Sequence, residues 1–103
     1  MPPIERGSIV AVLRTVLDPE VGINIIDLGL VYGIEVQDRD IRLTMTMTSA
    51  ACPFGAYLQE SAERAIRARL PDVGTLETTM VWHPAWDSAM MSADAKRQLG
   101  WRG

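Results

Sequence analysis

Residues 41–48, IRLTMTMT, alternate strictly between two kinds of side chain, and no other feature of the chain constrains the fold as much. Successive side chains of a β-strand point to opposite faces, so a period of two predicts a strand. We expect one face to be packed and the other to be polar or partly covered. The packed face consists of Ile41, Leu43, Met45 and Met47. The polar face consists of Arg42, Thr44, Thr46 and Thr48. The preceding VYGIEV segment (31–36) predicts a hairpin partner that is joined through the turn QDRD (37–40).

The apolar pattern changes period soon after this strand. From Pro53 to Leu70, apolar residues recur three and four positions apart, which predicts a helix with one apolar stripe. The stripe consists of Phe54, Tyr57, Leu58, Ala62, Ala65 and Ile66. We expect an earlier helix over 9–17, which Ser8 caps and Pro19 stops. Its apolar face consists of Ile9, Val12, Leu13, Val16 and Leu17.

The remaining segments complete a short list of elements. Residues 21–30 form an apolar loop, residues 75–82 predict a third strand, and residues 92–99 predict a terminal helix with Ser92 as its cap. The order αββαβ(α) predicts an α+β fold of two layers, with the helices on one face of a small mixed sheet. At 103 residues, the chain 1–103 is expected to be a single domain.

Composition and charge exclude several classes of function. The net charge is −3 and the isoelectric point is near 5.0, whereas nucleic-acid binding usually requires a basic surface. No apolar run approaches the ~20 residues of a membrane-spanning helix, and the N-terminus lacks the pattern of a secretory signal. We therefore expect a cytoplasmic protein that binds neither nucleic acid nor membrane. The glycines match neither a P-loop nor the dinucleotide fingerprint.

Cys52 is the only cysteine, so the chain forms no internal disulfide. An iron–sulfur cluster usually requires four thiolates, so a cluster bound here would have to be shared with a second chain or a partner. With Pro53 at the first helical position, Cys52 becomes the helix cap, where free N–H groups and the helix dipole favour the thiolate. The alternative is a small buried side chain that fills the corner between strand and helix.

Two further segments carry candidate functional groups. Asp18 and Glu20 flank Pro19 and could act as a general base or a hard-metal site, although helix termination explains DPE equally well. Asp27 is interpreted as a loop or capping acid. The loop VWHPAWDSAMM (81–91) either plugs the core or offers a partner-binding patch of Trp82, Trp86, Met90 and Met91. His83 could serve as the base of a thiol-dependent enzyme.

Three motifs together resemble one known family. DPEVGINIIDLGLVYGIEV, MTMTSAACP and VWHPAWDSAMMSADAKRQLG are similar to the small iron–sulfur cluster assembly domains that include SufT and PaaD, over residues 8–101. The resemblance implies a fold like the C-terminal domain of NifU-type scaffolds. The chain lacks the cysteine-rich extension of PaaD-type members, which favours the stand-alone, SufT-like branch.

The resemblance also implies a function and a site. It implies an accessory factor, rather than an enzyme, that assembles iron–sulfur clusters or delivers them to client apo-proteins, and that works with the assembly machinery, as a homodimer. Cys52 is then the functional thiol, which could act as a transient cluster ligand shared between chains or with a partner, accept persulfide sulfur or contact a client. Asp18, Glu20, Thr48 and Ser49 are grouped with it. The alternatives are a thiol-dependent enzyme and an interaction module with a structural cysteine.

Overall fold

A three-stranded sheet in the order β1–β2–β3 forms the centre of the computed structural model, which describes residues 4–47 and 55–100. β1 (Val31–Gln37) and β2 (Asp40–Met45) are antiparallel, whereas β2 and β3 (Leu76–Met80) are parallel. Parallel strands need a long crossover, and α2 (Gly55–Arg69) provides it. The expected hairpin and small mixed sheet are confirmed.

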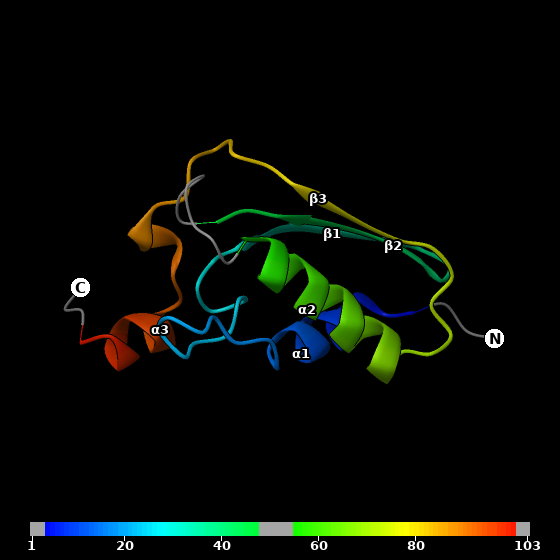
Figure 1. Cartoon of the computed structure of the whole chain (residues 1–103), viewed down its shortest axis with the longest axis horizontal. Coiled ribbons are helices and arrows are strands. Elements are labelled where there is room, and N and C mark those ends of the chain that lie inside the picture. Colours follow the sequence, from blue (N-terminus) through cyan, green and yellow to red (C-terminus); the bar gives the residue numbers. More distant parts are fainter. Residues whose placement is uncertain (1–3, 48–54, 101–103) are drawn as a thin grey trace.

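Both long helices cover the same face of the sheet. α1 (Arg6–Leu13) lies beside α2 under the strands (Figure 1). The apolar face of β2 is buried against them, as predicted from the period of two, and the core between the layers includes Ile9, Leu13, Ile41, Leu43, Met45, Met47, Leu58, Ala62 and Ile66. The two-layer α+β prediction is therefore confirmed.

The opposite face of the sheet is polar. Arg42 pairs with Glu35 on β1 and with Glu77 on β3, at 3.5 and 3.2 Å, and all three side chains are exposed. Thr46 is the exception on this face, because it is fully buried and its hydroxyl donates to the carbonyl of Val81 at 2.7 Å. At the other end of β2, the backbone N–H of Thr75 donates to Asp40 Oδ1 at 2.9 Å and lowers the pKa of Asp40.

The first helix differs from its prediction at both ends. Its N-cap is Glu5, and Ser8 lies inside the helix. The helix ends at Leu13, several residues before Pro19, because the chain is already extended when Val16 accepts the N–H of Ile25 and Leu17 bridges Asn24. Leu17 therefore leaves the helical face and is 52% exposed.

The other helices follow their patterns more closely. Leu58, Ala62 and Ile66 are buried along α2, but Tyr57, which was assigned to the same stripe, is 52% exposed. α3 (Ala93–Gln98) begins as predicted, because the Ser92 hydroxyl accepts the N–H of Ala95.

Beyond the sheet, a 3₁₀ turn, η1 (Ser88–Met90), and α3 lie past the end opposite the β1–β2 turn (Figure 1). None of the helices in the described parts of the chain has the length and apolar content to span a bilayer.

Candidate functional site

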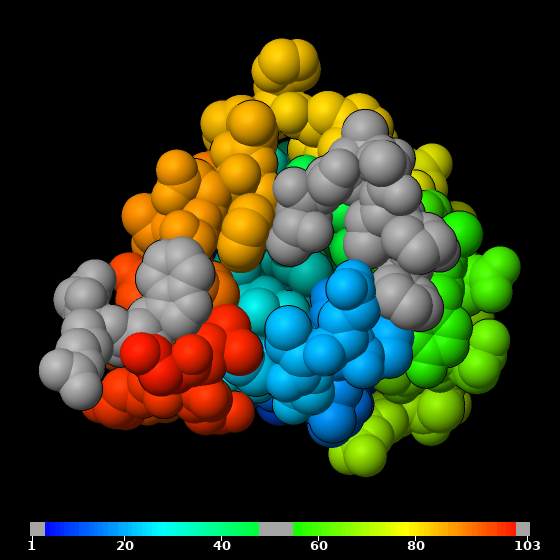
Figure 2. Space-filling model, turned by 60° about the vertical axis from the view of Figure 1, so that its left-hand side comes forward, coloured from blue at the N-terminus to red at the C-terminus, as the bar shows by residue number. Residues whose placement is uncertain are grey.

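One end of the molecule gathers most of the segments that the sequence marks as functional. β2 and β3 are parallel, so both strands run toward this end, and α2 starts there. Thr46, just past β2, is hydrogen-bonded to two other segments. Its N–H donates to the carbonyl of Leu30 and its hydroxyl donates to the carbonyl of Val81. Seen from this end, the loop 15–30 lies between the C-terminal segment and the start of α2 (Figure 2).

Three predicted site residues fall outside the described parts of the chain: Cys52, Thr48 and Ser49. The flanking residues fix where that segment starts and ends. Met47 is buried, and a Cβ added to Gly55 would lie 3.4 Å from Met47 Cγ, so the strand end and the helix start are adjacent. In the sequence, Cys52 precedes the first described residue of α2 by three positions. The prediction that it caps the helix stays a prediction.

The D-P-E motif forms a tight, hydrogen-bonded turn. Asp18 is only 4% exposed, and its Oδ1 accepts the backbone N–H of Glu20 at 2.7 Å. Its own N–H donates to Ile23, and Gly22, with φ at +71°, donates back to the carbonyl of Asp18. Asp18 thus has a structural role in the turn, whatever else its carboxylate does. Within residues 4–47 and 55–100, no three His, Cys, Asp or Glu side chains are placed to hold a metal ion.

The same two acids line a cavity of about 190 Å³ that we call the acidic cavity. Its walls combine the D-P-E turn with the 81–91 loop and the end of α3, as Asp18, Glu20, Val21, Leu28, Trp86, Met91 and Leu99. The structure therefore brings together D-P-E and the tryptophan loop, which lie more than 60 residues apart in the sequence. Both charged side chains of this lining are acidic, and its remaining walls are apolar.

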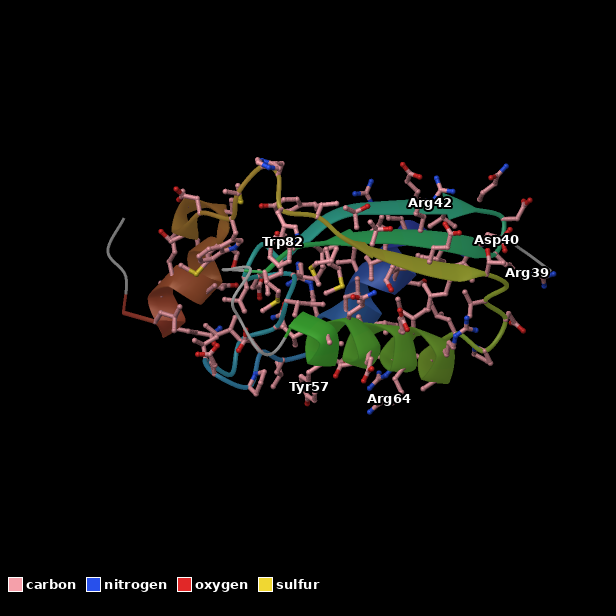
Figure 3. All side chains as sticks on the ribbon, turned by 45° about the horizontal axis from the view of Figure 1, so that its top comes forward. Arg39, Asp40, Arg42, Tyr57, Arg64 and Trp82 are labelled. Carbon is pink, nitrogen blue, oxygen red and sulfur yellow. The ribbon has the colours of Figure 1, made fainter. Side chains whose placement is uncertain are left out.

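Part of the 81–91 loop plugs the core and part of it is exposed, so each of the two interpretations of the loop fits some of its residues. Trp86 donates its indole N–H to the carbonyl of Leu28 at 2.8 Å, and Met91 is 5% exposed within the core, so these two residues plug the core. The placement of Met91 contradicts its assignment to an exposed patch. Trp82 and Met90 instead stay 42% and 38% exposed, and Trp82 lies just past β3 (Figure 3).

Tyr32 is a contact residue that the sequence analysis missed. Its hydroxyl lies 2.7 Å from the carbonyl of Pro84 and 3.4 Å from Met90 Sδ, so β1 holds the loop in place. With Gly29 and Val31, these residues line an open hollow of about 450 Å³, the Tyr32–Met90 hollow. The sequence signal for this contact was an aromatic residue next to Gly33 at the start of a predicted strand. In the structure, β1 shifts its register against β2 at this point.

Asp27 is confirmed as a loop acid with a structural role. Its carboxylate accepts the Asn24 amide at 2.8 Å and pairs with Arg14 at 3.3 Å, while its N–H donates to Asn24 Oδ1. Its carbonyl accepts the N–H of Ser92 at 2.7 Å. Asp27 therefore connects the end of α1, the apolar loop and the start of α3.

Residues 6–78 match the family model described as iron–sulfur cluster assembly protein. The chain belongs to this family. It is 38% identical over 96 residues to the Fe–S protein maturation auxiliary factor YitW of Bacillus subtilis, covering 92% of this chain and 93% of that protein. It is 41% identical over 86 residues to the Fe–S protein maturation auxiliary factor SufT of Staphylococcus aureus, covering 82% of this chain and 97% of that protein.

A solved member supports the same assignment at the level of structure. The crystal structure of a domain of unknown function, DUF59, from Bacillus anthracis superposes with a TM-score of 0.89 at 36% identity, covering 93% of this chain and 92% of that one. The family resemblance drawn from the three motifs is thereby confirmed, and so is the fold class.

Proposed function

We propose that this family member is an accessory factor that helps to assemble iron–sulfur clusters or deliver them to client proteins, acting through Cys52 and protein contacts rather than as an enzyme. The observation that carries this proposal is the match to maturation auxiliary factors over most of the chain. We place this activity in the cytoplasm, where reducing conditions keep a single thiol free.

The thiol is proposed to act in transient contact with the cluster. A cluster usually takes four thiolates and each chain supplies one, so the other ligands come from a second copy, from a partner or from free thiols. A homodimer would double the thiols at one site. We propose that Cys52 caps α2, where the free N–H groups of the first turn and the helix dipole would favour the thiolate.

The surroundings of the thiol support contacts with other proteins. We propose that Asp18, Glu20, Thr48 and Ser49 belong to the thiol site, with the carboxylates reached through the acidic cavity. Met90, which lines the Tyr32–Met90 hollow, and Trp82 are both exposed and are proposed to contact the assembly machinery or a client apo-protein. Tryptophan and methionine are enriched in protein interfaces. Trp86 and Met91 would hold this surface in place from the core side.

A purified transfer assay tests the proposal. A cluster-loaded scaffold protein is mixed with an apo-dehydratase that needs a [4Fe–4S] cluster, and the recovery of dehydratase activity is followed. We expect this chain to accelerate recovery, and Cys52→Ser to lose about tenfold of that stimulation, because the thiolate is the metal ligand. His83→Gln should act like the wild type, which separates this mechanism from a thiol-dependent enzyme with a histidine base.

Variants of the exposed loop provide the second arm of the assay. Trp82→Ala combined with Met90→Ala should raise the chain concentration needed for half-maximal stimulation, whereas Arg39→Ala, at the distant β1–β2 turn, should not. If the wild-type chain produces no stimulation, the proposed function is wrong. If Cys52→Ser stimulates fully while the loop variant fails, the chain is an interaction module with a structural cysteine.

A further inference from the structure

Two residues that the sequence pattern assigns to the core are exposed, and both lie at the same place. Leu17 was expected on the apolar face of the first helix and Tyr57 on that of the second, yet each is 52% exposed. Both line one hollow of about 320 Å³ between the segment after α1 and one side of α2. Val21 is also 43% exposed, but it lines the acidic cavity rather than this hollow. Large exposed apolar side chains that gather at one site mark interaction surfaces.

We call this hollow the α1–α2 groove and define it by its lining, which is Thr15, Val16, Leu17, Tyr57, Ser61, Arg64, Ala65 and Ala68. The α2 residues follow helical spacing, so they form a second stripe beside the buried one of Leu58, Ala62 and Ile66. Ser61, Ala65 and Ala68 are small and leave the floor open. The stripe from Tyr57 to Ala68 covers about three helical turns, roughly 16 Å, which matches the length of a short docked helix.

The groove also carries a charge of defined sign. Arg64 is the one charged side chain among the lining residues, and it is exposed. In the described parts of the chain, Arg14, Arg42 and Arg97 have carboxylate partners, whereas Arg64, like Arg6, Arg39, Arg67 and Arg69, forms no ion pair. Glu63 is used elsewhere, because it accepts the hydroxyl of Thr78 on β3. Figure 3 shows Tyr57 and Arg64 projecting from the same side of α2, away from the sheet.

We propose that the α1–α2 groove binds an amphipathic helix of a partner protein, with large apolar side chains against Leu17 and Tyr57 and a carboxylate against Arg64. Helices dock their apolar faces into such grooves, and tyrosine and arginine are among the residue types enriched in interface hot spots. Two turns separate Tyr57 from Arg64, about 10 Å along the helix axis, so the partner's acid should lie about two turns from its apolar anchor. This inference goes beyond the proposed function and does not depend on the thiol.

A library of helical peptides displayed on phage tests the proposal without a known partner. The library randomises the exposed positions of a stable helix, and the full-length folded chain is the bait. We expect enriched peptides to carry an Asp or Glu two turns from a Leu, Phe or Trp. Their synthetic versions should bind about tenfold or more weakly to Tyr57→Ser and to Leu17→Ser, which remove apolar anchors. Both substitutions are at exposed positions, and the unfolding midpoint of each variant checks that it is folded.

A charge exchange makes the test specific to Arg64. Against Arg64→Glu, the selected peptides should lose binding, and peptides with Lys in place of their acid should regain it. Arg39→Glu makes the same charge change at the far turn and should leave binding unchanged. Enrichment without a preference for acid, retention of binding by the groove variants, or the absence of any enriched helix would overturn the proposal.

Two further controls test whether a second copy of the chain fills the groove and whether the groove depends on the thiol. If wild-type chain self-associates in sedimentation experiments and Tyr57→Ser abolishes it, a second copy fills the groove and the proposal is wrong. Cys52→Ser used as bait should select the same peptides. Failure of the transfer assay would therefore leave the groove intact, and failure of the selection would leave the thiol mechanism intact.

Discussion

Replacement of Gly29 by alanine is expected to lower the free energy of unfolding by about 3 kcal/mol, from two separate costs. The residue has φ at +78°, where a Cβ costs roughly 1–2 kcal/mol. The new Cβ would also lie 2.5 Å from the backbone carbonyl oxygen of Met90, too close without a shift of the loop. Forced displacement in a packed region costs about 1–3 kcal/mol. Urea unfolding measures the change.

Two other glycines provide matched controls for this prediction. Gly22 has φ at +71° but open space around it, so Gly22→Ala should show the conformational cost alone, about 1–2 kcal/mol. Gly7 lies in α1 with nothing within 4 Å, and alanine there should stabilise the fold by at most about 1 kcal/mol. If Gly29→Ala costs no more than Gly22→Ala, the 81–91 loop does not depend on its contact with Gly29.

Replacement of Asp27 by alanine is expected to cost a similar amount, about 3 kcal/mol, because a buried charged acceptor is lost. The side chain accepts from Asn24 and Arg14, and the variant would leave the Asn24 amide without its partner. Alanine keeps the backbone carbonyl that accepts the N–H of Ser92, so the loss comes from the side-chain contacts of the turn, and urea unfolding measures it.

The control for Asp27 removes its most exposed partner. Arg14→Ala should cost less than about 1 kcal/mol, because the guanidinium is partly solvated. Asp27→Asn, which keeps the shape and one acceptor, should fall between the two. Equal destabilisation by Asp27→Ala and Arg14→Ala would mean that the ion pair, rather than the buried turn, carries the stability.

The pattern of side chains predicted the layers well because burial and period are tightly linked in this chain. Ile41, Leu43 and Met45 alternate and are all buried under the helices, and the hairpin turn lies where its polar residues indicate. The Ser92 cap was also predictable, since a cap depends on residues within one helical turn. Local signals of this kind need no knowledge of distant segments.

Features that depend on distant partners were not predictable. Leu17 continues the helical pattern, but the helix ends at Leu13 and Leu17 forms a β-bridge with Asn24. Tyr57 satisfies the apolar period of α2 and is nevertheless exposed in the α1–α2 groove, which it lines together with residues 15–17 after the end of α1. The two tryptophans of the 81–91 loop are equivalent in sequence, and only the carbonyl of Leu28, 58 residues away, selects Trp86 for the core.

The candidate site was predictable to a similar degree. The D-P-E acids and the tryptophan loop were both identified, and they meet at the acidic cavity. The structural role of Asp18 depends on its backbone hydrogen bonds with Ile23 and Gly22. The D-P-E motif alone does not predict these hydrogen bonds. The predictions for Cys52, Thr48 and Ser49 fall outside the described residues and stay open to experiment.

The most direct test of the central claim is the activity of iron–sulfur enzymes in cells that lack this chain and are complemented with Cys52→Ser. Wild-type chain should restore those activities, while the variant, at equal protein level, should recover about a tenth of the gain or less, since serine cannot replace a thiolate ligand. An enzyme without a cluster serves as the control and should not change. Full restoration by Cys52→Ser would contradict the thiol mechanism, and unchanged enzyme activities in cells without the chain would contradict the proposed function itself.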